Sequence, residues 1–530
     1  ELAPLKRLIV ERTEGNPFFI EEIVQALFDD GALVRNGTVK VTRSLSQIRL
    51  PRTVQGILAA RIDRLPSEHK QLLQRLAVVG RESPLSLVQR LTTTARPQVE
   101  QMLADLQSGE FIYEQVAAAD TEYVFKHALT QEVAYSSILI ERRKLLHERI
   151  GQTIEEVFAQ QVDDHVTALA HHYSRSDNTE KAVEYLGRAG QQAIQRSAYV
   201  DAISSLTAAI SLLQKLPESP EHAQRELPLQ LALGSASIAA KGWAAHEVEQ
   251  AYTRARQLCE QLGDPPELFP ALLGLWAVHF LRAELRLAYE LAERLRRRAQ
   301  STHDQLLLSY SHLALGNTSY TMGNLLFARD HLEAAIVLYK QERNLLGGVN
   351  AKVVCLSYAA ATLMFLGYPD RALCKVNEAL ALAQELSHPF SLAFAELWVS
   401  SIHNFRRETR SAQETAERVL ALSIEYGLTD HFAWATIQRG SAMTAQGLHE
   451  EGIARLQEGI AACRATGAQW GRPYFLCSLA EACMKAGRLD EGLTALAEAL
   501  AAADAHEERN YEPEMHRLKG ELLLRQDHSK

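Results

Sequence analysis

Cysteine is scarce in this chain, and no two cysteines stand at the C-x-x-C spacing of a redox or zinc motif. The 530 residues include six of them: Cys259, Cys355, Cys374, Cys463, Cys477 and Cys483. All six fall in segments predicted to be helical, so we expect buried, reduced thiols in a cytoplasmic protein. The scarcity excludes a small disulfide-stapled fold, and we expect no metal site.

Long apolar runs and an excess of basic charge are also missing. The longest apolar run, Pro270–Leu281, is too short to cross a bilayer, and residues 1–12 lack the apolar centre of a signal peptide. The net charge is −9 and the isoelectric point is about 6.1. This balance does not favour binding to nucleic acid or to a membrane surface, so we expect neither as a direct partner.

The main basic cluster lies within Glu141–Arg149, where two glutamates interleave with the basic residues. Leu145, Leu146 and Ile150 predict an apolar stripe on the same helix. The segment is therefore interpreted as a packed helix with a solvated face, in preference to a helix that reads DNA.

The adjacent residues His171 and His172 are a second candidate cluster. On a helix, neighbouring side chains point about 100° apart. The pair is therefore interpreted as a helix face near a partner, in preference to metal ligands.

A repeat occupies more than half of the chain. Its anchor positions recur every 40 or 44 residues: Ala283, Gly323, Gly367, Arg407, Gly447 and Gly487. Small or apolar residues follow each anchor at offsets of five, nine and twelve, which share one face of a helix. A small residue also stands seven positions before every anchor except the first, where Trp276 occurs, and this predicts close helix pairs. Such stacked helical hairpins usually bind partners and rarely catalyse reactions.

Residues 51–160 have the composition of a small mixed domain. Helices are predicted at Thr53–Arg64, Ser67–Val79, Leu85–Leu91, Gln98–Leu106, Ala128–Leu139 and Glu141–Phe158, and strands near Phe111–Val116 and Tyr123–Phe125. A soft linker, Ala117-Ala118-Ala119-Asp120, separates the two strands. Helices followed by a strand pair are typical of a winged helix.

Residues 1–50 predict a helix, a turn at Gly15-Asn16-Pro17 and a second helix, Phe18–Phe28. Two short strands, Ala32–Val34 and Thr38–Val41, flank Asn36-Gly37, a strong hairpin dipeptide.

Five segments resemble, in order, the end of the ATPase module and the following domain of STAND signal-transduction ATPases. They are Leu8–Glu22, Leu50–Val54, Ala60–Leu65, Ala77–Arg81 and Phe125–Leu129. The resemblance implies the C-terminal end of an ATPase module over residues 1–50 and a winged-helix-like domain over 51–160. Residues 161–530 resemble long tetratricopeptide repeats, so the expected fold is mainly α, ending in an α-α superhelix.

The same resemblance implies two positions that contact nucleotide. Pro17, in the Gly-x-Pro element, would pack on an adenine ring, and His127 would donate a hydrogen bond to the β-phosphate of ADP. Ala128 stands where the family pattern has an acidic residue. The structural alternatives are an ordinary helix-start proline and a histidine satisfied by the preceding strand.

A phosphate-binding loop is missing, because no G-x-x-x-x-G-K-[ST] motif occurs. The paired metal-binding aspartates of a cyclase domain are not recognisable either. We therefore expect that the chain is not an enzyme and holds no cofactor of its own, with ATP or ADP bound by a longer parent protein. Glu1 at the first position and the repeat-like helix Glu512–Arg525 at the end favour a piece of such a parent.

The function expected from these observations is the sensor region of a STAND ATPase that controls an adenylate or guanylate cyclase. The repeats would bind a protein or small-molecule inducer, and the first residues would contact the ATPase module. Two alternatives stay open: the sensor region of an ATP-dependent transcription regulator, and a free-standing repeat adaptor that never meets nucleotide.

Overall fold

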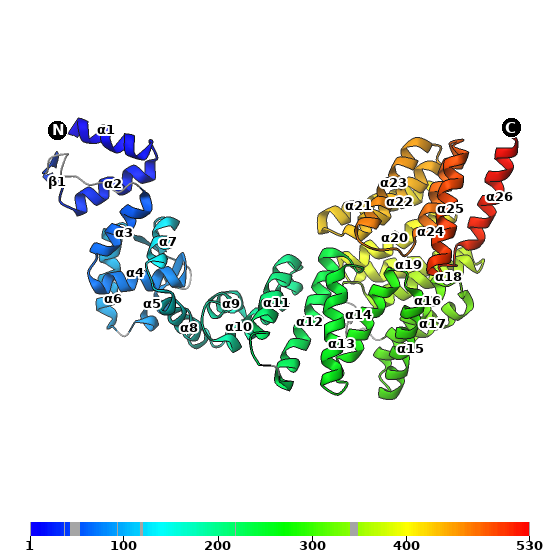
Figure 1. Cartoon of the computed structure of the whole chain (residues 1–530), viewed down its shortest axis with the longest axis horizontal. Helices are drawn as coiled ribbons and strands as arrows, with labels where there is room; N and C mark the ends of the chain where they lie inside the picture. The colour runs from blue at the N-terminus through cyan, green and yellow to red at the C-terminus, as the bar shows by residue number, and fades with distance from the viewer. Residues whose placement is uncertain are drawn as a thin grey trace. The chain divides into compact units, whose positions relative to one another are not determined.

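The computed structural model describes residues 2–36, 38–42, 53–92, 94–116, 120–217, 219–339 and 348–528. Within these ranges the chain is mainly α-helical and carries two small antiparallel sheets (Figure 1). It divides into two compact units, Glu1–Ala189 and Gly190–Lys530. Gly37 of the expected hairpin, the linker residues 117–119 and positions 50–52 lie outside the described residues.

The predicted elements of the first unit are confirmed, most of them to within three residues. The unit contains α1 (Leu2–Thr13), α2 (Pro17–Asp29), β1 (Leu33–Asn36), β2 (Thr38–Val41), α3 (Val54–Arg64), α4 (Ser67–Val79), β3 (Glu82–Pro84), α5 (Leu85–Leu91), α6 (Arg96–Ser108), β4 (Ile112–Val116), β5 (Thr121–Phe125), α7 (Ala128–Ser136), α8 (Ile140–Val157), the 3-10 helix η2 (Val162–His165) and α9 (Val166–Tyr173). Helix α10 (Thr179–Gln195) crosses into the second unit.

Strand β3 was not predicted, and it completes a three-stranded antiparallel sheet of order β3-β5-β4. It pairs with β5 over three residues, as in Ser83 opposite Tyr123, while β4 and β5 form a hairpin. A strand this short carries no readable alternation of apolar and polar residues. The order of α4, β3, α5, α6 and the β4–β5 hairpin agrees with the helices and strand pair that the sequence predicts. The winged-helix-like domain over residues 51–160 stays a prediction.

The second unit is a run of antiparallel helical hairpins, seen from green to red in Figure 1. Its helices are α11 (Tyr199–Leu213), α12 (Pro220–Lys241), α13 (His246–Gln261), α14 (Leu268–Leu281), α15 (Leu285–Thr302), α16 (Gln305–Thr321), α17 (Leu325–Leu338), α18 (Ala351–Phe365), α19 (Pro369–Glu385), α20 (Pro389–Phe405), α21 (Thr409–Tyr426), α22 (Thr429–Ala445), α23 (His449–Ala465), α24 (Arg472–Lys485), α25 (Leu489–His506) and α26 (Glu512–His528). The expected superhelix of tetratricopeptide-like repeats is confirmed.

Each of the six anchors ends the first helix of a hairpin in the left-handed region of backbone space. Four are glycines, and the other two, Ala283 and Arg407, have φ of 57° and 64°. In every case the following residue donates its backbone N–H to a carbonyl five positions earlier, as Arg488 does to Cys483 at 2.9 Å. This is the Schellman arrangement, which satisfies carbonyl groups that the helix end leaves open.

The small residues around the anchors allow the close helix pairs that the sequence predicts. A Cβ atom added to Gly452 would lie 2.8 Å from the carbonyl oxygen of Gly440 on the paired helix. Where Ser400 replaces glycine, its hydroxyl donates to the Ala412 carbonyl at 2.8 Å. Close backbone approach therefore sets the spacing of the hairpins.

Replacing Gly447 with alanine is expected to lower the free energy of unfolding of the second unit by about 1–2 kcal/mol. Gly447 has φ 95°, and an added Cβ would meet no atom within 4 Å, so backbone strain is the only cost. Gly520 is a matched control, because it is equally open but lies inside α26. Gly520→Ala should stabilise the chain by up to about 1 kcal/mol. Urea denaturation of both variants checks that the free energy of unfolding falls for Gly447→Ala and rises for Gly520→Ala. Equal changes in the two variants would show that backbone strain at Gly447 is not the cause.

Two expectations about individual side chains are wrong. Cys374 is exposed, whereas the other five cysteines are buried. On α8, Leu145 is 66% exposed, and the buried face instead contains His147, Ile150 and Ile154. At the end of the chain, Met515, Leu518 and Leu522 of α26 form a buried apolar stripe. Among the described helices, none is both long enough and apolar enough to cross a bilayer.

Candidate functional site

Aromatic side chains from the first helices of successive hairpins meet in the middle of the second unit. Phe280 of α14, Tyr358 of α18, Trp398 of α20 and Trp434 of α22 belong to one cluster of buried and half-buried residues. All five tryptophans of the chain lie in this aromatic centre: Trp243, Trp276, Trp398, Trp434 and Trp470. Trp276, Trp398 and Trp434 meet because each lies on the first helix of its hairpin, whereas Trp243 and Trp470 come from loops.

Trp470 enters the aromatic centre from the loop between α23 and α24. Its ring stacks on Trp434 with centroids 4.8 Å apart, and Phe280, Tyr358 and Trp398 surround it at 6.0–6.3 Å. The indole Nε1–H donates to the hydroxyl of Thr321 at 3.0 Å. An aromatic ring with a satisfied polar edge is well suited to a buried anchor.

This loop and the next one bind turns of much earlier hairpins. The backbone N–H groups of Gln469 and Trp470 both donate to the carbonyl of Leu281, at 2.9 and 3.0 Å. In the α25–α26 loop, the N–H groups of Arg509 and Asn510 donate to the carbonyl of Thr321, at 2.9 and 3.2 Å. The two loops therefore close the superhelical turn across its centre.

Glu508 holds the two closing loops together. Both of its carboxylate oxygens accept from the backbone N–H of Gly471, at 3.0 and 3.2 Å. The side chain is buried, and this burial raises the pKa of Glu508 to about 8. Because the protonated form is favoured in the folded state, the closure loses stability as the pH rises from about 4.5 towards 8.

Beside Trp434, on which Trp470 stacks, the aromatic centre contains a cavity of about 100 Å³. Its walls are almost entirely apolar and aromatic: Trp243, Trp276, Phe280, Tyr358, Phe390, Phe394 and Trp434 contribute, and Ala468 of the α23–α24 loop completes them. A cavity of this size accommodates one aliphatic side chain or a comparable apolar group.

A few polar groups line the same cavity. Among the described residues, Asn317 Oδ1 and His431 Nε2 are buried atoms with no hydrogen-bond partner. Burial lowers the pKa of His431 to about 4 and raises the pKa of the adjacent Asp430 carboxyl. An apolar cavity with a few unsatisfied polar atoms is the usual form of a ligand site, since each buried polar atom otherwise costs free energy.

Pro17 and His127, the two positions implied by resemblance, both lie in the first unit. Pro17 is exposed and begins α2, after Asn16 caps the helix by accepting from the Phe19 N–H. His127 is the residue before α7, and its ring lies 4.2 Å from that of Phe18. His127 Nε2 is a buried atom without a hydrogen-bond partner among the described residues. The structure thus brings His127 to the start of α2, against Phe18, the residue after Pro17.

Ion pairs fix α2 against the domain that carries His127. The buried Arg61 contacts Glu22 at 2.5 Å and donates to the carbonyl of Gly109 at 2.7 Å. Lys126, the neighbour of His127, contacts Glu21 of α2 at 2.5 Å and Glu110 at 2.8 Å. These contacts fix the position of α2 relative to the start of α7.

Sequence reasoning missed Trp470, Glu508 and the cavity. One signal was available: every tryptophan falls between positions 243 and 470, although the repeats extend further in both directions. Nothing in the sequence indicates which distant turn a loop residue reaches.

No family model matches the chain. An uncharacterised protein of Rhizobium meliloti (strain 1021) is 24% identical over 526 residues, which are 97% of this chain and 50% of that protein. The chain therefore spans about half the length of this curated relative.

Solved structures of similar helical arrangement were also found. A STAND protein with a tetratricopeptide repeat sensor from Pyrococcus horikoshii has a TM-score of 0.48 at 12% identity, over 97% of this chain and 71% of that one. NprR in complex with its cognate peptide NprX has a TM-score of 0.45 at 14% identity, over 71% of this chain and 97% of that one.

Proposed function

We propose that this chain is the regulatory region of a STAND-type signalling protein, and that its repeats bind an inducer at the aromatic centre. The observation that carries the proposal is the cavity beside Trp434, which combines aromatic walls with the unpartnered atoms Asn317 Oδ1 and His431 Nε2. An inducer of matching chemistry inserts one apolar group and supplies a hydrogen bond to each polar atom.

A ligand in this cavity contacts the α23–α24 loop, which is one of the two closing loops. Ala468 lines the cavity, Trp470 follows two residues later, and Gly471 is the partner of Glu508. A ligand that favours one arrangement of this loop shifts the balance between open and closed states of the superhelix by its difference in affinity for the two.

The nucleotide side of the proposal rests on the resemblance of residues 1–155 to STAND ATPases. There Pro17 packs on adenine, and the unpartnered Nε2 of His127 donates to a phosphate oxygen. Release of the bound ADP then passes the signal to an output domain. We propose a nucleotidyl cyclase as that output, with transcription regulation as the alternative.

The test compares peptide binding to the unmodified chain with peptide binding to a variant whose cavity is filled by a larger side chain. A library of blocked hexapeptides rich in leucine, valine and phenylalanine serves as the probe, and tryptophan emission is the readout because all five tryptophans lie in the aromatic centre. Peptides selected on the unmodified chain are expected to lose at least tenfold in affinity against Ala468→Leu, whose longer side chain occupies the cavity.

Ala501→Leu is the matched control, because Ala501 is exposed on α25. This variant should bind the selected peptides as the unmodified chain does. If no peptide binds, or if both variants bind equally well, the cavity is not the inducer site.

A further inference from the structure

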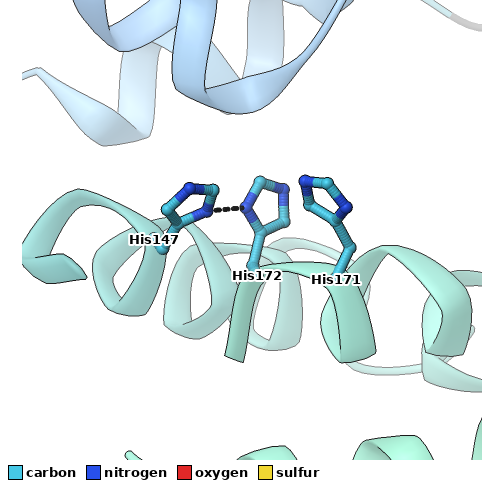
Figure 2. Close-up of side chains that lie close together, drawn as sticks. All are labelled: His147, His171 and His172. Carbon is cyan, nitrogen blue, oxygen red and sulfur yellow. Dashed lines mark hydrogen bonds between the residues drawn. The ribbon is translucent and has the colours of Figure 1, made fainter. Parts of the chain in front are cut away.

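Three histidines meet where helices α8 and α9 pack in the first unit. His147 comes from the middle of α8, and His171 and His172 come from the last turn of α9 (Figure 2). One potential ligand nitrogen from each ring can be chosen so that all three lie within 4.8 Å of one another. Among the described residues this is the only such group of three or more histidine, cysteine or acidic side chains.

The packing of α8 against α9 explains why the three rings meet. An added Cβ on Gly151 would lie 2.8 Å from the Tyr173 ring, so only glycine admits that ring at this crossing. His147 is one turn before Gly151 on α8, and His172 directly precedes Tyr173 on α9. The close contact therefore fixes the register that places His147 opposite His172, with their Nδ1 atoms 2.9 Å apart.

The hydroxyl of Tyr135 orients His147 from the other side. It lies 3.0 Å from Nε2 of His147. When Nε2–H donates to this hydroxyl, the lone pair of Nδ1 points into the cluster. A hydrogen bond from the second ring nitrogen is the usual way in which proteins orient a metal-binding histidine.

The charge states of the rings are compatible with metal binding. Burial lowers the pKa of His147 to about 4 and that of His172 to about 3. These two rings are therefore neutral near pH 7, the form in which imidazole donates a lone pair. Arg143 and Arg175 are the cations nearby. Their repulsion weakens affinity for any cation, and a ligand set of imidazoles alone disfavours hard ions that prefer carboxylate ligands.

We propose that His147, His171 and His172 bind one Zn²⁺ ion that fastens helix α8 to helix α9. Nitrogen ligands about 2.0–2.1 Å from a tetrahedral zinc ion lie about 3.4 Å apart. His147 and His172 separate by roughly half an ångström to reach this geometry. His171, whose side chain is exposed, swings inward as the third ligand. Water fills the fourth position.

A second histidine pair provides an internal comparison. His312 and His331, in the second unit, also have their Nδ1 atoms close together, at 2.8 Å. No third histidine, cysteine or acidic group joins them in a cluster among the described residues. Two imidazoles alone form an incomplete zinc site, so this pair should not bind zinc with comparable affinity.

The experiment uses the full chain with Cys374→Ser, which removes the exposed thiol as a competing ligand. After removal of metal by a chelator, the chain is titrated with ZnCl₂ in a calorimeter. The expected result is one site per chain with a dissociation constant in the micromolar range or below. Co²⁺ should give the visible absorption of a tetrahedral complex, and thermal unfolding of the first unit should shift upward with Zn²⁺.

His171→Ala is the decisive variant, because it removes an exposed ligand without disturbing the buried pair. It should weaken zinc binding at least tenfold and abolish the thermal shift, while His331→Ala should change neither. His147→Gln and His172→Gln should lose binding as well, although their burial makes them less suitable as first tests. Absence of a stoichiometric site, or equal binding by His171→Ala and the parent chain, would overturn the proposal.

Discussion

Replacing Trp470 with alanine is expected to lower the free energy of unfolding of the second unit by about 3–5 kcal/mol. The indole is 7% exposed, packs against four aromatic rings and donates a hydrogen bond to Thr321. Removing it leaves a large void beside an existing cavity, and the surrounding rings come from different helices that cannot all move inward. Urea denaturation, followed by the emission of the remaining tryptophans and by circular dichroism, measures the loss.

Trp470→Phe separates packing from hydrogen bonding at this position. It keeps an aromatic ring in the centre and loses the bond to Thr321, so the loss should be clearly smaller than that of Trp470→Ala. A change below about 1 kcal/mol for the alanine variant would show that the loop does not anchor the closed turn.

In a parent protein that carries the complete ATPase module, His127→Ala is expected to weaken ADP retention tenfold to a hundredfold. The proposal assigns one hydrogen bond from Nε2 to a charged phosphate oxygen, and such bonds contribute about 1.5–3 kcal/mol. The dissociation rate of a fluorescent ADP analogue checks the prediction. Basal output should rise with the loss of ADP.

Pro17→Ala is the companion variant for the nucleotide site. Only ring packing on adenine disappears, so its effect on the dissociation rate should be smaller than that of His127→Ala. His165→Ala tests specificity, because this histidine stacks on Phe158 and lies outside the site. An unchanged ADP dissociation rate in His127→Ala would remove His127 from the nucleotide site.

The periodic part of the fold could be predicted because local chemistry repeats. Glycine at four anchors indicates a left-handed helix end, and the spacing of 40 or 44 residues identifies Ala283 and Arg407 as equivalent although neither is glycine. Helix starts were equally readable, as with Pro17 at the beginning of α2. These features depend on a few neighbouring residues, so a single sequence contains them.

The buried face of α8 agrees with the predicted apolar stripe at Ile150 and differs from it at Leu145. Hydrophobicity favours Leu145 as a core residue, whereas His147 is the one that is buried. The deciding contact is between Gly151 and Tyr173, which rotates α8 so that His147 faces α9. Such a contact between two helices is not visible in the pattern of either one. The same reason hides the group of His147, His171 and His172.

The closing loops make the folding of the second unit unlike that of an open repeat array. In an open array each hairpin contacts only its neighbours, so folding starts anywhere and terminal repeats unfold one at a time. Here the bond from Trp470 to Thr321 joins residues 149 positions apart. Such a contact forms only after the intervening hairpins are ordered, which delays it to a late and slow step. Once it has formed, the hairpins between α14 and α24 open together, so amide hydrogen exchange in this span proceeds as one cooperative block.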